Sequence, residues 1–378
     1  MKQICIWVSI LCACFASVAW SQQPAAKGRH NWSEFHRQNM MRWNPYEKVL
    51  NVNNVGSLQV KWKYATGGEV NSSPAVVNGV VYAGSQNGTF YALRASTGRK
   101  RWSYGTGGQV QSSPAVANGV VYFDSFDGNV YALKASTGHK VWSYATGGSG
   151  LASAPTVVNG VVYVGGGNSE NNVHALKADT GTLLWSYATG GRVLPSPALS
   201  AGVAYVGSDD GNLYALDAST GALLWSYATG QLVWDSPAVS NGVVYESQDG
   251  NLYALDASTG ALLWSYSIGS TTYSSAAVAY GVVYVGSDNG TLYALDAQGG
   301  TLLWSYTTGT TITSPAVANG VVYVGSDKLY AFDASTGGLL WSYTTGQIAS
   351  SPTVANGVVY AGSYSGVVYA FGLKTGRK

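Results

Sequence analysis

The sequence predicts an all-β fold, an eight-bladed β-propeller with four-stranded blades. The 378-residue chain is only 10% charged and contains 49 Gly and 27 Tyr, which suits short strands joined by tight turns and does not suit disorder. The segment NLYALDASTGALLWSY occupies residues 212–227 and returns unchanged at 251–266. Looser copies recur with a period near 40 residues, which is typical of one four-stranded propeller blade.

Each copy of the repeated phrase carries one tryptophan. The spacings between the eight tryptophans are 40, 40, 43, 40, 39, 40 and 37 residues. We expect them to be structural docking residues, each burying roughly 150–250 Å² between blades. They are Trp62, Trp102, Trp142, Trp185, Trp225, Trp264, Trp304 and Trp341.

One unit shows the four strands in order. SPAVSNG predicts a strand that enters an Asn-Gly turn, VVYESQDG a second strand that ends in Asp-Gly, NLYALDASTG a third and ALLWSY a fourth. Asn-Gly and Asp-Gly favour the positive φ angles of tight hairpins. Strands such as VVYVG have no polar face, and stacked blades explain this because each sheet is covered on both sides.

The ring is expected to close through its N-terminal strand. SLQVKWKYATGG, residues 57–68, reads as an outer strand that precedes the first inner strand, whereas the last unit ends without a tryptophan phrase. The predicted plan is therefore an N-terminal extension at 22–54 that packs on the propeller, followed by eight blades over 55–378. Closure also removes exposed sheet edges.

Residues 1–21 read as an export signal. Lys2 is followed by an apolar stretch, residues 4–19, and small residues at Ala19 and Ser21 permit cleavage before Gln22. A membrane anchor is the alternative, but the stretch lies at the lower edge of the roughly 17–25 residues that a spanning helix needs. A lipoprotein with Cys14 lipidated is a further alternative, and only in that case do we expect membrane association. We expect export to the periplasm or cell envelope, with secretion left open.

Little in the sequence indicates catalysis or metal binding. All three cysteines lie within residues 5–14, so a chain cleaved after Ser21 has no disulfide, thiolate or cysteine-based metal site. The four histidines show no metal-ligand spacing. The formal net charge of +2 selects no nucleic acid partner. We therefore expect neither catalytic residues nor a metal site.

ALDASTGALLW, residues 215–225, resembles the tryptophan-docking motif of PQQ-type propeller repeats. Ala215, Gly221 and Trp225 occupy its first, seventh and eleventh positions, and equivalents recur around most of the ring. The resemblance implies a fold that serves two classes of protein. Quinoprotein alcohol dehydrogenases bind pyrroloquinoline quinone and calcium, whereas BamB-like outer-membrane assembly proteins are scaffolds without a cofactor.

Departures from the dehydrogenase pattern favour the scaffold. The resemblance to quinoprotein dehydrogenases implies a disulfide of adjacent cysteines, a Glu and an Asn on calcium, an Asp base and a nearby Arg, and none of these matches here residue by residue. The predicted inner strands also supply little of the charge that calcium requires. We expect an exported, monomeric, non-catalytic interaction or scaffold propeller with a protein partner and no cofactor. A PQQ-dependent oxidoreductase is the alternative, and a small-ligand or glycan-binding propeller is a third.

The copies differ at positions that are free to carry function. Three residues before the inner-strand proline, or its alanine replacement, the eight units place Asn71, Gln111, Ala152, Leu194, Trp234, Tyr273, Ile312 and Ala349. Trp234 is the only propeller tryptophan outside the docking phrase. Unusual charges lie in the same connections, namely Glu69, Arg192 and Asp235, and around the second-to-third turns, namely Asp124, Glu170 and Glu246.

Up-and-down strand order puts both of these loop sets on one face, near one mouth of the channel. The candidate binding residues on that face are Trp234, Asp235, Tyr273, Arg192, Glu69, Asn71 and Gln111. Solvated loop variation is the alternative interpretation.

An uneven distribution of charge is expected on the opposite face of the ring. Units one to three carry Arg94, Lys134 and Lys177 where units four to seven carry Asp217, Asp256, Asp296 and Asp333. The basic side continues through Arg99, Lys100, Arg101, His139 and Lys140, and ring closure would add Lys374, Arg377 and Lys378. Such a patch is either a solvated face or a surface for anionic lipid head groups or an acidic partner.

Overall fold

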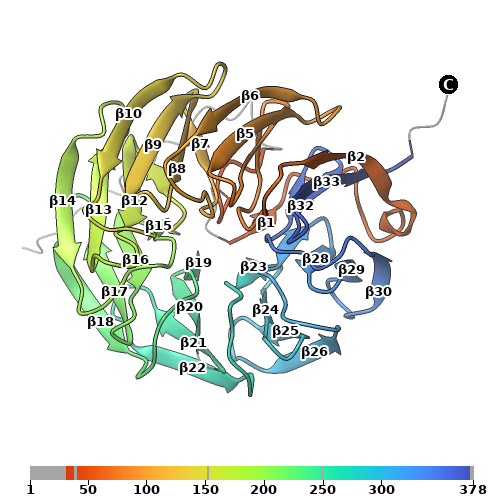
Figure 1. Ribbon diagram of the computed structural model, residues 1–378. Helices are drawn as coiled ribbons and strands as arrows, with labels where there is room; N and C mark the ends of the chain where they lie inside the picture. Colours follow the sequence, from red (N-terminus) through yellow and green to blue (C-terminus); the bar gives the residue numbers. More distant parts are fainter. Residues whose placement is uncertain (1–30, 38–40, 151–152, 249, 375–378) are drawn as a thin grey trace, which may run out of the picture.

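The protein is a closed ring of eight antiparallel sheets, as Figure 1 shows. The structure, a computed structural model, describes residues 31–37, 41–150, 153–248 and 250–374. The predicted eight-bladed all-β propeller is confirmed. The export signal predicted for residues 1–21 lies outside the described residues, as do Arg377 and Lys378.

Blades 1 to 4 each contain four consecutive strands. Blade 1 consists of β3 (Ala75–Val77), β4 (Val80–Gly84), β5 (Thr89–Arg94) and β6 (Lys100–Gly105). Blade 2 consists of β7 (Ala115–Ala117), β8 (Val120–Asp124), β9 (Asn129–Lys134) and β10 (Lys140–Ala145). Blade 3 consists of β11 (Thr156–Val158), β12 (Val161–Gly165), β13 (Asn172–Lys177) and β14 (Leu183–Ala188). Blade 4 consists of β15 (Ala198–Ser200), β16 (Val203–Gly207), β17 (Asn212–Asp217) and β18 (Leu223–Ala228).

Blades 5 to 8 complete the ring. A 3-10 turn, η1 (Val55–Ser57), precedes the first propeller strand. Blade 5 consists of β19 (Ala238–Ser240), β20 (Val243–Gln248), β21 (Asn251–Asp256) and β22 (Leu262–Ser267). Blade 6 consists of β23 (Ala277–Ala279), β24 (Val282–Gly286), β25 (Thr291–Asp296) and β26 (Leu302–Thr307). Blade 7 consists of β27 (Ala316–Ala318), β28 (Val321–Gly325), β29 (Leu329–Asp333) and β30 (Leu339–Tyr343), with β1 (Trp43–Asn44) added. Blade 8 consists of β31 (Thr353–Ala355), β32 (Val358–Gly362), β33 (Val367–Gly372) and β2 (Gln59–Ala65).

The turns adopt the conformations that their residues predict. In blade 5, Asn241 and Gly242 join β19 to β20 with φ angles of 51° and 77°, the two positive values of a hairpin turn that matches strand twist. The second strand of each blade is buried along almost its whole length, as in β4, because the neighbouring blades cover both of its faces.

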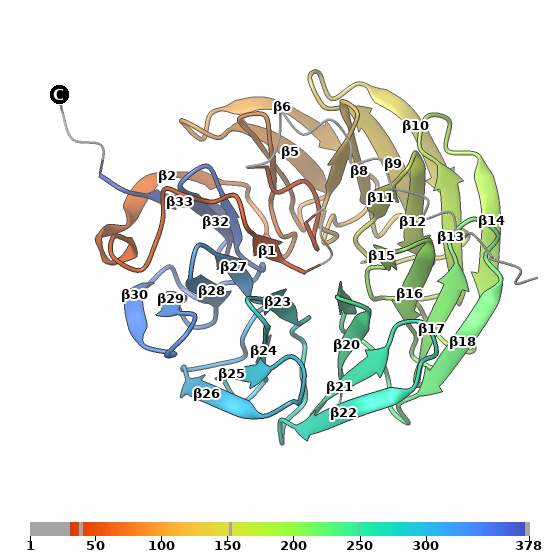
Figure 2. The same ribbon diagram turned by 180° about the vertical axis from the view of Figure 1, so that it is seen from behind.

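The ring closes as predicted, through the N-terminal strand. The first propeller strand, β2, pairs antiparallel with the last, β33, and sets Trp62 opposite Ala370. Figure 2 shows the two strands side by side from behind, although they come from opposite ends of the chain. Blade 8 is thus built from both ends, which joins the first and last blades by main-chain hydrogen bonds.

Each docking tryptophan joins its blade to the next. The indole Nε1 of Trp225, in blade 4, donates to the carbonyl oxygen of Ala257 in blade 5 at 3.1 Å. Its ring lies on Gly260, where an added Cβ would lie only 2.7 Å from the indole. The absence of a side chain at this glycine therefore leaves room for the tryptophan ring of the preceding blade.

The same hydrogen bond recurs around the ring at 2.7–3.2 Å. The donor and acceptor pairs are Trp62–Ala95, Trp102–Ala135, Trp142–Ala178, Trp185–Ala218, Trp225–Ala257, Trp264–Ala297, Trp304–Ala334 and Trp341–Leu58. A tyrosine of the second strand often shares the acceptor, since the Tyr205 hydroxyl also donates to Ala257.

The described N-terminal residues 31–37 and 41–54, here called the N-terminal segment, pack on the inner strands of the ring. Trp32 forms a bridge with Val76 of blade 1, and β1 pairs in parallel with β27, which gives blade 7 a fifth strand. Contacts at Asn78 and Gly357 place the segment near the first-to-second turns. The segment therefore occupies the channel end that lies opposite the fourth-to-first connections.

A buried arginine side chain holds this segment against the ring. The Arg42 guanidinium is fully buried and donates to the carbonyl oxygens of Pro315 at 2.8 Å, Phe35 at 2.7 Å and Pro352 at 3.1 Å. Its carbon also lies 4.4 Å from the Phe35 ring centroid, within cation–π range. Arg42 thus ties the segment to blades 7 and 8.

Candidate functional site

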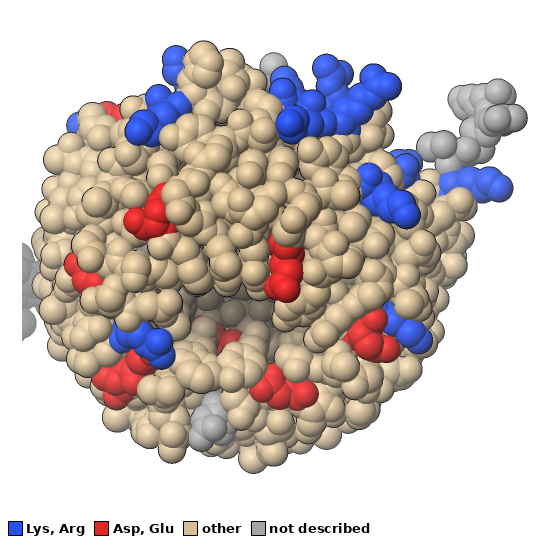
Figure 3. All heavy atoms as spheres, in the orientation of Figure 1, with Lys and Arg blue, Asp and Glu red and all other residues tan. Residues whose placement is uncertain are grey.

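One face of the propeller, here called the mouth, is formed by the fourth-to-first connections and the second-to-third turns. Main-chain hydrogen bonds join the two loop sets, for example from Asp209 N to Arg192 O and from Asp288 N to Thr271 O, both at 2.9 Å. The two loop sets therefore lie on one face of the ring, as predicted. Figure 3 shows this face hollowed at its centre, with acidic side chains at the rim and in the depth.

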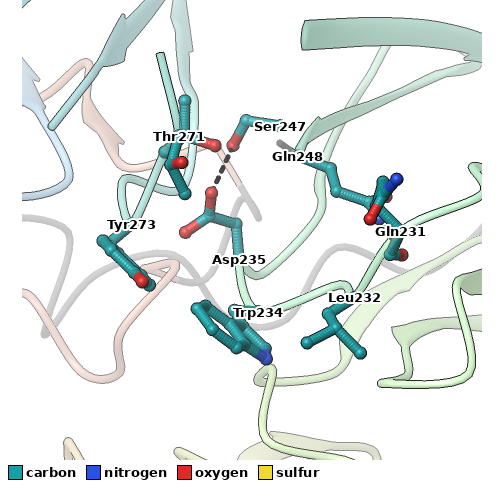
Figure 4. A pocket seen from close by; sticks show the side chains of 9 residues that line it. Gln231, Leu232, Trp234, Asp235, Ser247, Gln248, Thr271 and Tyr273 are labelled. Carbon is teal, nitrogen blue, oxygen red and sulfur yellow. Dashed lines mark hydrogen bonds between the residues drawn. The ribbon is translucent and has the colours of Figure 1, made fainter. Parts of the chain in front are cut away.

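A pocket of about 210 Å³ opens at the mouth beside blades 5 and 6. Residues from the connection between blades 4 and 5, the end of β20 and the connection between blades 5 and 6 line it. They are Gln231, Leu232, Trp234, Asp235, Ser247, Gln248, Thr271, Thr272 and Tyr273. Figure 4 shows Asp235 above Trp234, with Tyr273 to one side.

Two aromatic rings form one wall of the pocket. Trp234 and Tyr273 stack with their ring centroids 5.2 Å apart and their planes 12° apart. Tyr273 is 50% exposed and Trp234 is half-buried. The buried Nε1 of Trp234 has no hydrogen-bond partner among the described residues, so this indole lacks the anchoring bond that each docking tryptophan makes.

A buried carboxyl group lies against the aromatic pair. Asp235 is 4% exposed, and its Oδ2 accepts a hydrogen bond from the Ser247 hydroxyl at 3.0 Å. Burial raises the pKa of Asp235 to about 7. Burial, together with the charge of Asp235, raises the pKa of Glu246 well above its ordinary value. Burial also raises the pKa of Asp288, so three carboxyl groups in this part of the mouth are protonated more readily than exposed ones.

The structure brings three of the predicted site residues together, and the other four lie elsewhere. Trp234, Asp235 and Tyr273 share the pocket. Arg192, in the connection between blades 3 and 4, forms an ion pair with Asp209 of blade 4. The remaining residues belong to blades 1 and 2.

In those two blades, Glu69 accepts a hydrogen bond from Gln86 at 2.9 Å, and Gln111 donates to Gln109 at 2.8 Å. Asn71 is half-buried, and its Oδ1 accepts no hydrogen bond within the described part of the chain. A binding role for any of these residues stays a prediction.

Two charges predicted near turns lie within strands. Asp124 ends β8 and Glu246 lies in β20, and both are fully buried. The signal was present, since Asp124 replaces the glycine and Glu246 the fourth-position valine of the VVYVG pattern. Glu170, by contrast, lies before β13, and its Oε2 is 3.2 Å from Nε2 of His174 on that strand.

Sequence reasoning missed Gln248, Ser247 and Thr272 as pocket residues. Gln248 and Ser247 follow Glu246 on β20, a strand that reads as buried core. Their approach to the connection between blades 5 and 6 depends on blade stacking, which the repeat alone does not specify.

The residues at the mouth do not fit a calcium-bound quinone. Among the described residues no group of three or more His, Cys, Asp or Glu side chains is arranged to hold a metal ion. All three cysteines precede residue 15, outside the described part, so the ring offers no cysteine pair to clamp a quinone. The structure therefore gives no donor set through which PQQ chemistry could be derived.

No helix in the described ranges is both long and apolar enough to cross a membrane.

The fold and the mouth define a PQQ-type propeller, eight blades locked by tryptophan docking and closed by the N-terminal strand. The family model described as "Beta-alanine-activating enzyme, beta-propeller" matches residues 45–280. The chain belongs to this family. The model described as "Outer membrane protein assembly factor BamB" matches residues 249–346 and 310–378.

Solved propellers of two functional classes share the fold. The quinohemoprotein alcohol dehydrogenase ADHIIG from Pseudomonas putida HK5 aligns with a TM-score of 0.80 at 19% identity, over 93% of this chain and 81% of that one. The quinohemoprotein alcohol dehydrogenase from Comamonas testosteroni gives 0.80 at 19%, over 92% and 82%. BamB from Moraxella catarrhalis gives 0.71 at 21%, over 84% and 100%. No curated protein matches the sequence.

Proposed function

We propose that this protein is an exported, non-catalytic scaffold propeller that binds a protein partner at its mouth. The observation that carries the proposal is the pocket, in which Trp234 and Tyr273 stack beside the buried Asp235. Its volume of about 210 Å³ lies below the roughly 300–1,000 Å³ of small-molecule sites. A pocket of that size suits one anchoring side chain of a partner.

The chemistry of the pocket favours a cationic anchor. None of its lining residues is Lys, Arg or His, whereas Asp235 lies within it and Glu246 interacts electrostatically with Asp235. A guanidinium group can stack on an aromatic face and donate two hydrogen bonds to a carboxylate. An arginine side chain therefore uses both the aromatic wall and the acidic wall.

The comparisons support a scaffold in two ways. One matched family model describes an assembly factor, BamB, and a BamB structure covers 84% of this chain. The dehydrogenases share the fold equally well, but the donor set that their cofactor needs has no counterpart at this mouth. Export rests on residues 1–21, and the cell envelope is the compartment in which an assembly partner would be met.

A displayed peptide library tests the binding site. Peptides are selected on the wild-type protein and counter-selected on the double variant Trp234→Ala, Tyr273→Ala. We expect enrichment of peptides with one arginine beside apolar residues, and loss of binding by the double variant. Peptides that bind both proteins equally would refute the mouth as the recognition site.

The alternative function has its own test. The purified protein is titrated calorimetrically with pyrroloquinoline quinone and calcium, and dye reduction is followed with alcohols and sugars. We expect no binding in the micromolar range and no turnover. Micromolar or tighter quinone binding together with turnover would replace the scaffold by a PQQ-dependent oxidoreductase.

A further inference from the structure

A cluster of cations lies on the rim of blades 1 and 2, away from the pocket. We call Arg94, Arg99, Lys100, Arg101, Lys134 and Lys140 the basic arc. All six are exposed, and within the described part of the chain none forms an ion pair. The strand pairs that carry them, residues 89–105 and 129–145, contain no Asp or Glu. Figure 3 shows Lys and Arg gathered on this part of the rim, near β6 and β10.

The fold does not require these charges. The three residues before the docking tryptophan are RKR at 99–101 and HKV at 139–141, but TLL at 182–184 and ALL at 222–224. The leucine blades have the same strand register and the same tryptophan hydrogen bond. The cations therefore distinguish one sector of a ring whose architecture is otherwise repeated.

The first described residue of the chain, Asn31, lies beside this sector. The Asn31 side chain accepts a hydrogen bond from Asn78 N at 3.2 Å, in the first-to-second turn of blade 1. The carbonyl of Gly79, in the same turn, accepts a hydrogen bond from Ala95 N at 2.9 Å, and Ala95 follows Arg94. Asn31, the first described residue, therefore lies one turn away from the basic arc.

We propose that the basic arc lies against the anionic lipid head groups of a membrane, a surface separate from the partner-binding mouth. Long, unpaired cations spread over two blades match the diffuse negative charge of a lipid surface, where each Lys or Arg contributes roughly 1 kcal/mol. The spread of these cations over two neighbouring blades, rather than around a single pocket, favours a lipid surface over one acidic protein segment. Bound this way, the propeller rests on its rim.

Vesicle flotation with the full chain tests the proposal. Binding is compared between phosphatidylcholine vesicles and vesicles that also contain phosphatidylglycerol. The variant Lys100→Gln, Lys140→Gln removes two charges from the arc, and the control Lys48→Gln, Lys328→Gln removes two charges elsewhere. Because all variants keep the same N-terminus, phosphatidylcholine vesicles report any contribution of the apolar stretch.

We expect the wild type and the control to prefer the anionic vesicles, and added salt to weaken that preference. The arc variant should bind these vesicles roughly 30-fold more weakly, from two contributions of roughly 1 kcal/mol at 1.4 kcal/mol per tenfold. Equal binding to both vesicle types by the wild type would overturn the proposal. An equal loss in the arc variant and the control would overturn it as well.

Discussion

The docking tryptophans and Trp234 differ in their side-chain contacts. A docking residue such as Trp225 covers a glycine of the next blade and donates to a carbonyl there. Trp234 stacks on Tyr273, and its Nε1 has no partner in the described part of the structure. The first arrangement holds two blades together, whereas the second places a stacked aromatic pair at the mouth.

Truncating a docking tryptophan and truncating Trp234 should therefore have different effects on stability. Trp225 is half-buried but packs on the next blade, so Trp225→Ala should lower the free energy of unfolding by up to the roughly 3–5 kcal/mol of a buried aromatic truncation. Trp234→Ala should leave the melting temperature nearly unchanged. Thermal unfolding of the two variants checks this, and a Trp234→Ala midpoint as low as that of Trp225→Ala would make Trp234 a packing residue.

The docking glycine can be tested against a matched control in the same blade. Gly260 and Gly242 have φ angles of 72° and 77°, but an added Cβ meets the Trp225 ring only at Gly260. Each alanine costs roughly 1–2 kcal/mol for the left-handed backbone, and Gly260→Ala adds roughly 1–3 kcal/mol of overpacking. In denaturant unfolding, Gly260→Ala should therefore have a lower free energy of unfolding than Gly242→Ala. Equal losses would mean that the glycine serves the turn alone.

At the scale of elements, β2 and the segment before it connect the first blade with the last. β2 completes blade 8, and Arg42 donates to carbonyls of blades 7 and 8. A chain that begins at Gly67 loses both, exposes the edge of β33, and lacks Leu58, whose carbonyl oxygen accepts the hydrogen bond from Trp341. We expect aggregation or a large loss of stability, seen by light scattering and thermal unfolding. A monomer that melts like the parent would contradict closure through β2.

The repeat explains how much of these elements could be predicted. Eight copies of one phrase specify strand order, turn type and the docking tryptophans, because each blade solves the same packing problem. The path of the N-terminal segment has no repeat behind it, and buried groups such as Arg42 follow from contacts with several blades. In the pocket, Trp234, Asp235 and Tyr273 were predictable as departures from the repeat, whereas Gln248 comes into reach only through blade stacking.

For the whole molecule, buried ionisable groups of the N-terminal segment couple stability to pH. Burial raises the pKa of Glu34 to about 8, from an ordinary 4.5. Burial and the charge of Arg42 lower the pKa of His36 to about 3, from an ordinary 6.5. Glu34 thus stabilises the fold fully below pH 4.5 and loses that contribution as pH rises to about 8. The contribution of His36 is constant above pH 6.5.

Stability should therefore fall between pH 6.5 and about 8, the window in which Glu34 still titrates and His36 does not. Asp235, with a pKa of about 7, adds to the fall at its lower end. Glu34→Gln keeps an acceptor for Val157 N and cannot ionise, so this variant should show a shallower fall. Melting temperatures across the window measure the effect, and a wild-type midpoint that is flat or rising would contradict it.

The whole molecule combines a closed ring, a channel end occupied by its own N-terminal segment and an open mouth with an aromatic, acidic pocket. The basic arc on the rim and the carboxyl groups of the mouth are two separate regions of opposite sign. A scaffold can use such sectors independently, one to lie on a surface and the other to hold a partner.

The affinity of a selected arginine peptide for the wild type and for Trp234→Ala tests the central claim most directly. If the mouth is the recognition site, the dissociation constant of the variant should be larger by roughly 30-fold or more, because an aromatic anchor contributes about 2 kcal/mol or more to binding. The melting temperature should stay at the wild-type value. Calorimetry that gives the same affinity for both proteins would contradict the mouth as the binding site.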